Sequence, residues 1–163
     1  FYNPDSIKLD KTKKFKTVGG RTVYGGGGIM PDLFVAQDTT GFTSYYVNAV
    51  NSGLLQKFAF QLVEKYRPVL KGVKTLDQLK RVIPRDDTLL NNFVSFAAVN
   101  GVPARWYYIN QSRQLLLGQI KALVALDALG YSDYIKSIND GDNTFRRAVD
   151  AMQKGLSSEI TSK

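Results

Sequence analysis

The stretch LLQKFAFQLVEKYRPVL, Leu54 to Leu70, decides the fold class of this 163-residue chain. Its apolar residues recur at spacings of three and four, which places them on one face of a helix. The residues on this face are Leu55, Phe58, Ala59, Leu62, Val63 and Tyr66. Pro68 lacks the N–H group that a helix interior needs, so we expect this helix to end or kink near Arg67.

Helical periodicity continues on both sides of this stretch, from Phe42 nearly to the end of the chain. Ser, Thr, Asp and Asn side chains that can accept bonds from free N–H groups mark the expected helix starts. These starts are Thr43 or Ser44, Thr75 with Gln78, Asp86 to Thr88, Ser132, and Asp142 or Asn143. The longest expected helix has Pro103 in its first turn and ends at Gly130.

Two further apolar stripes predict which helical faces are buried. On the longest helix the stripe comprises Trp106, Ile109, Leu116, Ile120, Leu123 and Val124. On the last helix the residues expected to face inward are Phe145, Ala148, Val149 and Met152. Together these helices can enclose one hydrophobic core.

The first 40 residues have a different pattern, in which short extended runs alternate with glycines. Strands are expected near 14–18, 21–24 and 32–36, with Gly19-Gly20 as a hairpin turn. A hairpin with one extra strand is marginal alone and needs a larger sheet or helices to pack on. The sequence therefore predicts a mainly α fold, a bundle of about six or seven helices after a short glycine-rich β segment. The expected domains are a terminal β segment at 1–40, a helical domain at 41–157 and a flexible tail at 158–163.

Composition excludes several classes of site. The chain has no Cys and no His, which excludes disulfides, the usual zinc sites and a Ser-His-Asp triad within it. No apolar run approaches the roughly 20 residues that cross a bilayer. The net charge of +8 is compatible with nucleic acid binding, but about half of the excess lies in residues 1–24. A lysine-rich solvated segment explains this charge better than a phosphate-binding patch, so nucleic acid is the disfavoured partner.

Few residues are candidates for catalysis. A Ser-Lys dyad is the nucleophilic device that the composition still permits, but capping or solvent-facing helical positions account for Ser44, Ser52, Ser95, Ser112 and Ser132. Asp86 with Asp87, and Asp140 with Asp142, are expected to cap helices. Asp127 is expected to be partly buried and to bond with another helix, as in an ion pair with Arg146 or Arg147. The many aromatic side chains suit packing better than stacking on bases. No catalytic, cofactor-binding or metal-binding residue is assigned.

The run VYGGGGIMPD, Val23 to Asp32, calls for a separate explanation. It matches neither a P-loop nor a dinucleotide-binding fingerprint, and a strand rather than a helix is expected after it. Phosphate binding is therefore disfavoured. A geometric role is expected instead, in which glycine permits a bend or a close approach of the backbone.

The segment from Lys14 to Arg67 resembles the end of the C-terminal processing peptidases, the tail-specific Ser-Lys serine proteases, in their Bacteroidetes-type form. In that family a segment GR-x-x-x-G-x-G-I-x-P-D closes the peptidase core, and the YGGGGI-x-PD form is characteristic of this branch. The stretches Gln114 to Asp127 and Asp142 to Ala148 also resemble its helical tail. The residues that match the motif are Gly20, Arg21, Gly25 or Gly26, Gly28, Ile29, Pro31 and Asp32. Gly27 completes the run of four glycines.

The resemblance implies an exported, periplasmic parent in which a PDZ domain and the Ser-Lys core precede the present segment. The chain would then be a non-catalytic C-terminal fragment, whose helical tail supports the core, self-associates or presents protein substrates. Its partners would be the upstream core and PDZ domain, with a homo-oligomer as a further expectation. The alternative from the residues alone is a freestanding basic helical module that binds nucleic acid or an acidic partner.

Overall fold

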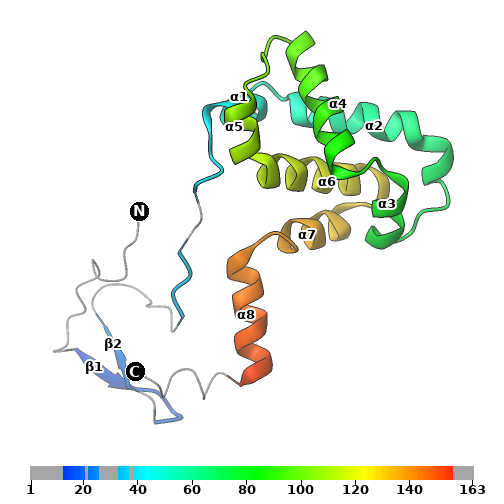
Figure 1. The fold of residues 1–163 in the computed structure, drawn as a ribbon. Coiled ribbons are helices and arrows are strands. Elements are labelled where there is room, and N and C mark those ends of the chain that lie inside the picture. The colour runs from blue at the N-terminus through cyan, green and yellow to red at the C-terminus, as the bar shows by residue number, and fades with distance from the viewer. Residues whose placement is uncertain (1–12, 21, 26–32, 37–38, 156–163) are drawn as a thin grey trace. The chain divides into compact units, whose positions relative to one another are not determined.

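The computed structural model describes residues 13–20, 22–25, 33–36 and 39–155, and it is drawn in Figure 1. It divides into two compact units, one formed by residues 38–146 and the other by residues 1–37 with 147–163. The described elements are eight helices and one two-stranded sheet, so the expected mainly α fold with a short β segment is confirmed. No helix in the described ranges is both long and apolar enough to cross a membrane.

The unit of residues 38–146 is built around one central helix, α6. Helices α2, α3, α4, α5 and α7 all contact α6, and α1 packs on α2 and α5 (Figure 1). The helices are α1 (Ser44–Asn51), α2 (Leu54–Leu70), α3 (Leu76–Val82), α4 (Asp86–Val99), α5 (Trp106–Gln111), α6 (Arg113–Leu129) and α7 (Tyr131–Asn139), followed by α8 (Asn143–Lys154), which spans both units.

The buried face of α2 agrees with its sequence pattern. Leu55, Phe58 and Leu62 are buried, as are Ala59 and Val63, while Tyr66 is half-buried against the same core. The ring of Phe58 meets that of the fully buried Phe93 from α4 edge to face, with centroids 5.4 Å apart. Removal of this apolar surface from water supplies the main driving force for assembling these helices.

The expected end of α2 near Arg67 is wrong, because the helix continues through Pro68 to Leu70. Because Pro68 has no N–H group, the helix loses the hydrogen bond that this position would otherwise donate to the carbonyl of Glu64. Pro68 lies in the last turn of α2, so little of the helix follows it. Leu70 is buried, and its burial favours completing that turn.

The expected single helix from 103 to 129 is two helices, α5 and α6, which meet at Ser112. The backbone of Ser112 departs from helical angles, with φ −88° and ψ 2°. Its side chain bonds outside the helix, to residues that precede α1, and this pairing competes with a continuous helix. Of the expected stripe, Trp106 is 47% exposed and Leu123 is half-buried, whereas Ile109, Leu116, Ile120 and Val124 are buried.

Three expected helix starts are confirmed. Thr43 accepts a bond from the N–H of Tyr46, and Thr75 accepts one from the N–H of Gln78. Asp142 accepts bonds from the N–H groups of Thr144 and Phe145 at the start of α8.

A fourth expected start is also confirmed, since α4 begins at Asp86, although its N-cap residue is Arg85 rather than an aspartate. The expected start at Ser132 is wrong, because Ser132 lies inside α7, whose N-cap residue is Gly130. Gly130 has φ 102° and ψ −178°, a conformation open almost only to glycine, so it begins α7 without a side-chain cap.

The expected inward face of α8 is also wrong. Phe145 is 46% exposed and Met152 is 72% exposed, Ala148 is exposed and Val149 is half-buried, while Ala151 is buried. The main core consists of side chains between Tyr45 and Ala125. Phe145, which lies in the part of α8 that belongs to the helical unit, is not among these side chains.

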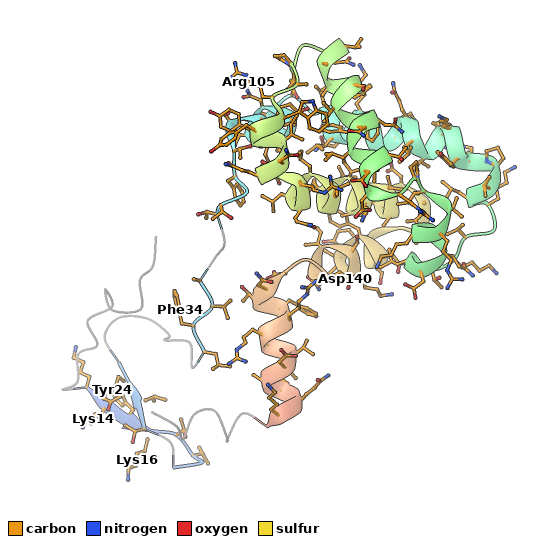
Figure 2. The ribbon with its side chains drawn as sticks, viewed as in Figure 1. Lys14, Lys16, Tyr24, Phe34, Arg105 and Asp140 are labelled. Atoms are coloured by element: carbon orange, nitrogen blue, oxygen red, sulfur yellow. The ribbon has the colours of Figure 1, made fainter. Side chains whose placement is uncertain are left out.

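The β segment is a hairpin of β1 (Lys14–Lys16) and β2 (Thr22–Tyr24), antiparallel, with Phe15 opposite Val23. Gly20 has φ 80° in the turn, and its N–H donates to the carbonyl of Thr17, as a glycine turn requires. Lys14 lies over the ring of Tyr24 from the opposite strand, 5.9 Å from its centroid (Figure 2).

The third expected strand, 32–36, is wrong for its described part, because 33–36 has no strand pairing. The two described strands pair with each other, so this segment lacks a ladder partner. Asp32, the motif residues Arg21, Gly26, Gly27, Gly28, Ile29 and Pro31, and the expected tail at 158–163 lie outside the described residues.

Candidate functional site

The five serines considered for a nucleophilic role have different surroundings. Ser44, Ser52, Ser95 and Ser132 are exposed, whereas Ser112 is fully buried. Ser112 holds one of the two kinds of position expected for it, as the residue between α5 and α6 that caps both helix ends, although its side chain makes no capping bond. The Ser112 hydroxyl donates to the carbonyl of Gly41 at 2.8 Å and lies 2.5 Å from Thr43 Oγ1. The bonding partners of Ser112 thus hold no basic group that could activate it.

The acidic pairs mainly form ion pairs. Asp86 pairs with Lys121 at 2.6 Å, Asp87 with Arg113 at 2.5 Å, and Asp140 with Lys80 at 3.2 Å. Asp142 caps the start of α8 with its side chain, Asp140 is the C-cap residue of α7, and Asp86 and Asp87 lie in the first turn of α4 without a capping bond. Exposed pairs of this kind contribute little stability, typically below about 1 kcal/mol each.

Asp127 does not behave as expected. It is exposed and forms no ion pair with either Arg146 or Arg147. Partial desolvation, followed by the negative charge of Glu64 on α2, raises the pKa of its carboxyl group. Arg67 bonds to Glu64 and lowers the pKa of that carboxyl group.

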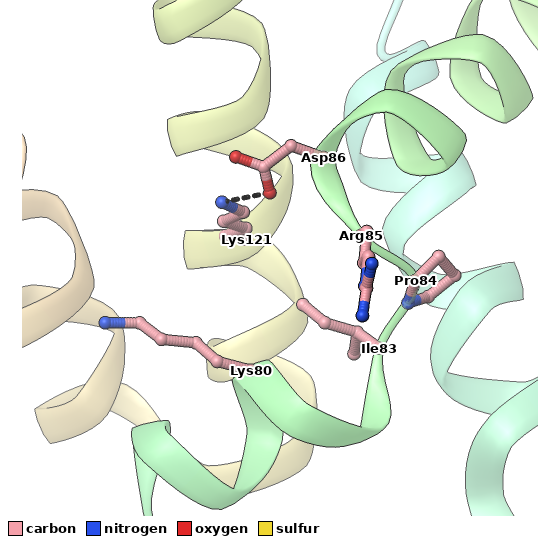
Figure 3. Close-up of a pocket in the computed structure, with 6 residues that line it drawn as sticks. All are labelled: Lys80, Ile83, Pro84, Arg85, Asp86 and Lys121. Carbon is pink, nitrogen blue, oxygen red and sulfur yellow. Dashed lines mark ion pairs between the residues drawn. The ribbon is translucent and has the colours of Figure 1, made fainter.

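A hollow with charged side chains in its lining lies where α3, α4 and α6 come together, and it has a volume of about 330 Å³. Figure 3 shows its lining: Lys80 from α3, Ile83 and Pro84 from the following turn, Arg85 and Asp86 at the start of α4, and Lys121 from α6. We call it the α3–α4–α6 pocket. Ile83 is buried and gives the pocket an apolar part beside its charged groups.

The charges around the α3–α4–α6 pocket do not balance. Its cations are Lys80, Arg85 and Lys121, and the carboxylates that pair with them are Asp140 and Asp86. The Arg85 side chain forms neither an ion pair nor a hydrogen bond with any part of the chain that the structure describes. One positive charge is therefore left uncompensated at the pocket.

Sequence reasoning missed the α3–α4–α6 pocket. The cations Lys80, Arg81 and Arg85 around Pro84 were a visible signal in the sequence. Lys121 is remote in the sequence, and the packing of α3 and α4 on α6 is what brings it to the same place.

No group of three or more Asp or Glu side chains in the described ranges could hold a metal ion. Of the glycine motif, Gly20 and Gly25 are described, and both belong to the hairpin region. A Cβ atom added at Gly25 would lie 2.8 Å from the ring of Phe15, so the absence of a side chain there permits close approach.

Comparison with known protein families places part of the chain in a family. The sequence pattern of the Family of unknown function (DUF8443) matches residues 45–130, which run from α1 to the residue that joins α6 to α7. No curated protein and no solved structure matches the chain.

Proposed function

The chain belongs to the Family of unknown function (DUF8443), and we propose that it is the non-catalytic C-terminal region of a Ser-Lys serine endopeptidase that cleaves proteins near their C-termini. The proposal rests on the similarity of the glycine-rich segment to the end of that peptidase core. In this view the helical domain supports the core, associates with a second copy or presents substrate. The parent is exported to the periplasm.

The exposure of the β1–β2 hairpin supports this assignment. No side chain of either strand is buried, and Phe15 is 59% exposed. A two-stranded hairpin is at best marginally stable in water, whereas the same hairpin at the edge of a larger sheet gains both ladder partners and a covered face. The peptidase core would provide such a sheet.

The first test is to read the gene upstream of the codon for Phe1. We expect a continuous reading frame that encodes a PDZ domain and a core with catalytic Ser and Lys. A reading frame that encodes neither would overturn the proposal.

The second test is a peptidase assay of the 163-residue chain with an unstructured substrate labelled at its C-terminus. We expect no cleavage, because in the described part of the chain the buried Ser112 hydroxyl bonds only to Thr43 Oγ1 and to the carbonyl of Gly41. Cleavage by the purified chain that the Ser112→Ala variant loses would contradict the non-catalytic role.

The net charge of +8 favours a second candidate, a basic module that binds nucleic acid. In the helical unit, however, carboxylates neutralise Arg113, Lys121 and Lys136 in ion pairs. Retention on DNA or heparin that falls by about 0.9 log units per log unit of salt for each phosphate contact would favour this candidate. Absence of retention at low salt would exclude it.

A further inference from the structure

We propose that the α3–α4–α6 pocket binds a small organic carboxylate that carries an apolar group, with the Arg85 guanidinium as its anchor. The proposal concerns the helical unit alone and does not depend on the parent peptidase.

The charge of the pocket selects the charge of the ligand. Lys121 already has Asp86 at 2.6 Å, and Lys80 has Asp140 at 3.2 Å, so Arg85 is the cation without a carboxylate. One uncompensated positive charge matches a ligand with one negative charge better than a multiply charged phosphate. A carboxylate also fits a guanidinium in shape, because two parallel N–H groups bond to its two oxygens.

The lining and size of the pocket select the rest of the ligand. Pro84 is half-buried beside Arg85 in the lining, and with the edge of the core residue Ile83 it forms an apolar wall against which an apolar group of the ligand can lie. A volume of about 330 Å³ is several times what a carboxylate group fills and lies within the usual range for small-molecule sites. The ligand is therefore a carboxylate with an aliphatic or aromatic body.

The N–H groups at the start of α4 are not needed for this site. Asp86 and Asp87 already place negative charge in the first turn of α4, where it interacts favourably with the helix dipole. The selectivity follows from the side chains of Arg85, Lys121 and Lys80, which three different segments bring together.

Titration of the ¹⁵N-labelled 163-residue chain, followed by NMR, tests the proposal. The probe is N-acetyl-leucine, and the controls are N-acetyl-leucinamide, which lacks the carboxylate, and acetate, which lacks the apolar group. For this open pocket we expect a Kd on the order of 1 mM for the probe, with shifts at the amides of Arg85, Asp86 and Lys121, and at least tenfold weaker binding of both controls. Equal binding of the amide, no binding of the probe, or tighter binding of inorganic phosphate would overturn the proposal.

Two pocket variants and one control variant distinguish binding in the α3–α4–α6 pocket from a general effect of the net charge. Arg85→Gln should weaken binding of N-acetyl-leucine at least tenfold. Arg105→Gln is the matched control, since Arg105 is also an exposed N-cap residue whose side chain makes no capping bond. The Arg105→Gln variant should bind N-acetyl-leucine as tightly as the unsubstituted chain. Asp86→Asn removes a carboxylate from the pocket and should tighten binding at least twofold, a gain that misfolding cannot produce. Equal affinity of the Arg85 and Arg105 variants would contradict the assignment.

Two sources can supply this ligand, a free carboxylic acid or the last residue of a peptide chain. Titration with 4-methylpentanoate, which has the leucine side chain and carboxylate but no peptide group, distinguishes them. Equal affinity for 4-methylpentanoate and N-acetyl-leucine supports a free acid, whereas clearly weaker binding of 4-methylpentanoate supports a peptide end.

Discussion

The hydroxyl oxygens of Thr43 and Ser112 lie 2.5 Å apart, although the two residues are 69 positions apart in the sequence. Thr43 caps α1, and Ser112 separates α5 from α6. The Ser112 hydroxyl also donates a hydrogen bond to the carbonyl of Gly41. This polar cluster therefore joins the start of the helical unit to its central helix.

Replacing Ser112 tests this connection. We expect Ser112→Ala to lower the free energy of unfolding by about 1–3 kcal/mol, because the buried Thr43 hydroxyl loses a bonding partner and the carbonyl of Gly41 keeps only the N–H of Thr43 as a donor. Urea unfolding followed by circular dichroism measures the change. The control is Ser95→Ala, at an exposed position in α4, which should change stability by less than about 0.5 kcal/mol. Similar values for the two variants would show that the cluster contributes nothing.

Replacing glycine by alanine should have opposite effects on stability at two positions, Gly130 at the end of α6 and Gly118 inside it. Gly130→Ala should destabilise the protein by about 1–3 kcal/mol, since φ 102° with ψ −178° is strained for any residue with a Cβ atom. Gly118→Ala should stabilise it by about 0.5–1 kcal/mol, because Gly118 is helical and a Cβ there would meet nothing within 4 Å. Thermal unfolding of both variants gives the signs. A stabilising Gly130→Ala would be inconsistent with the sharp join between α6 and α7.

The contact between Phe58 and Phe93 should be one of the most sensitive points of the core. Phe93 is fully buried, so Phe93→Ala is expected to cost about 3–5 kcal/mol. Phe93→Leu, which leaves a smaller cavity, should cost less and keep the variant folded for measurement in urea. Val99→Ala, at an 88% exposed position of the same helix, is the control and should have little effect. An equally small loss at Phe93 would contradict the observed packing.

The buried hydroxyl of Tyr45 predicts a loss of stability in alkali. Desolvation raises the pKa of Tyr45 from 10.0 to about 12, and its hydroxyl has no hydrogen-bond partner in the described part of the chain. Between these two pH values the unfolded chain loses this proton while the folded chain keeps it, so stability falls as pH rises, by as much as about 2.7 kcal/mol. Urea unfolding at pH 9 to 12 measures this loss.

Tyr45→Phe should reduce that loss and should be neutral or stabilising at pH 7, because it removes an unpaired buried hydroxyl. Tyr107→Phe is the control, as its side chain is 71% exposed. An unchanged pH profile for Tyr45→Phe would contradict the assignment.

Several elements could be predicted from local sequence because their causes are local. The apolar spacing in Leu54 to Leu70 predicted the helix and its buried face, and the short polar side chains of Thr43, Thr75 and Asp142 predicted three helix starts. Gly19-Gly20 predicted the hairpin turn. In each case, residues within one or two turns supply the interactions.

Three of the errors have a different cause, since they depend on contacts between residues that are distant in the sequence. Burial of Leu70 favours a helix that continues past Pro68, and the bonds of Ser112 to Thr43 and Gly41 divide a helix that the apolar period alone would leave whole. The segment 33–36 forms no strand because a strand needs a partner for its N–H and C=O groups.

The sequence by itself therefore determined the fold class, the hairpin and the buried face of α2, because period and propensity act over a few residues. The tertiary structure alone decided that Ser112 is buried and that Lys80, Arg85 and Lys121 share one pocket. Helices α3 and α4 must pack on α6 before Lys121 reaches the other two cations, and no local pattern encodes that approach.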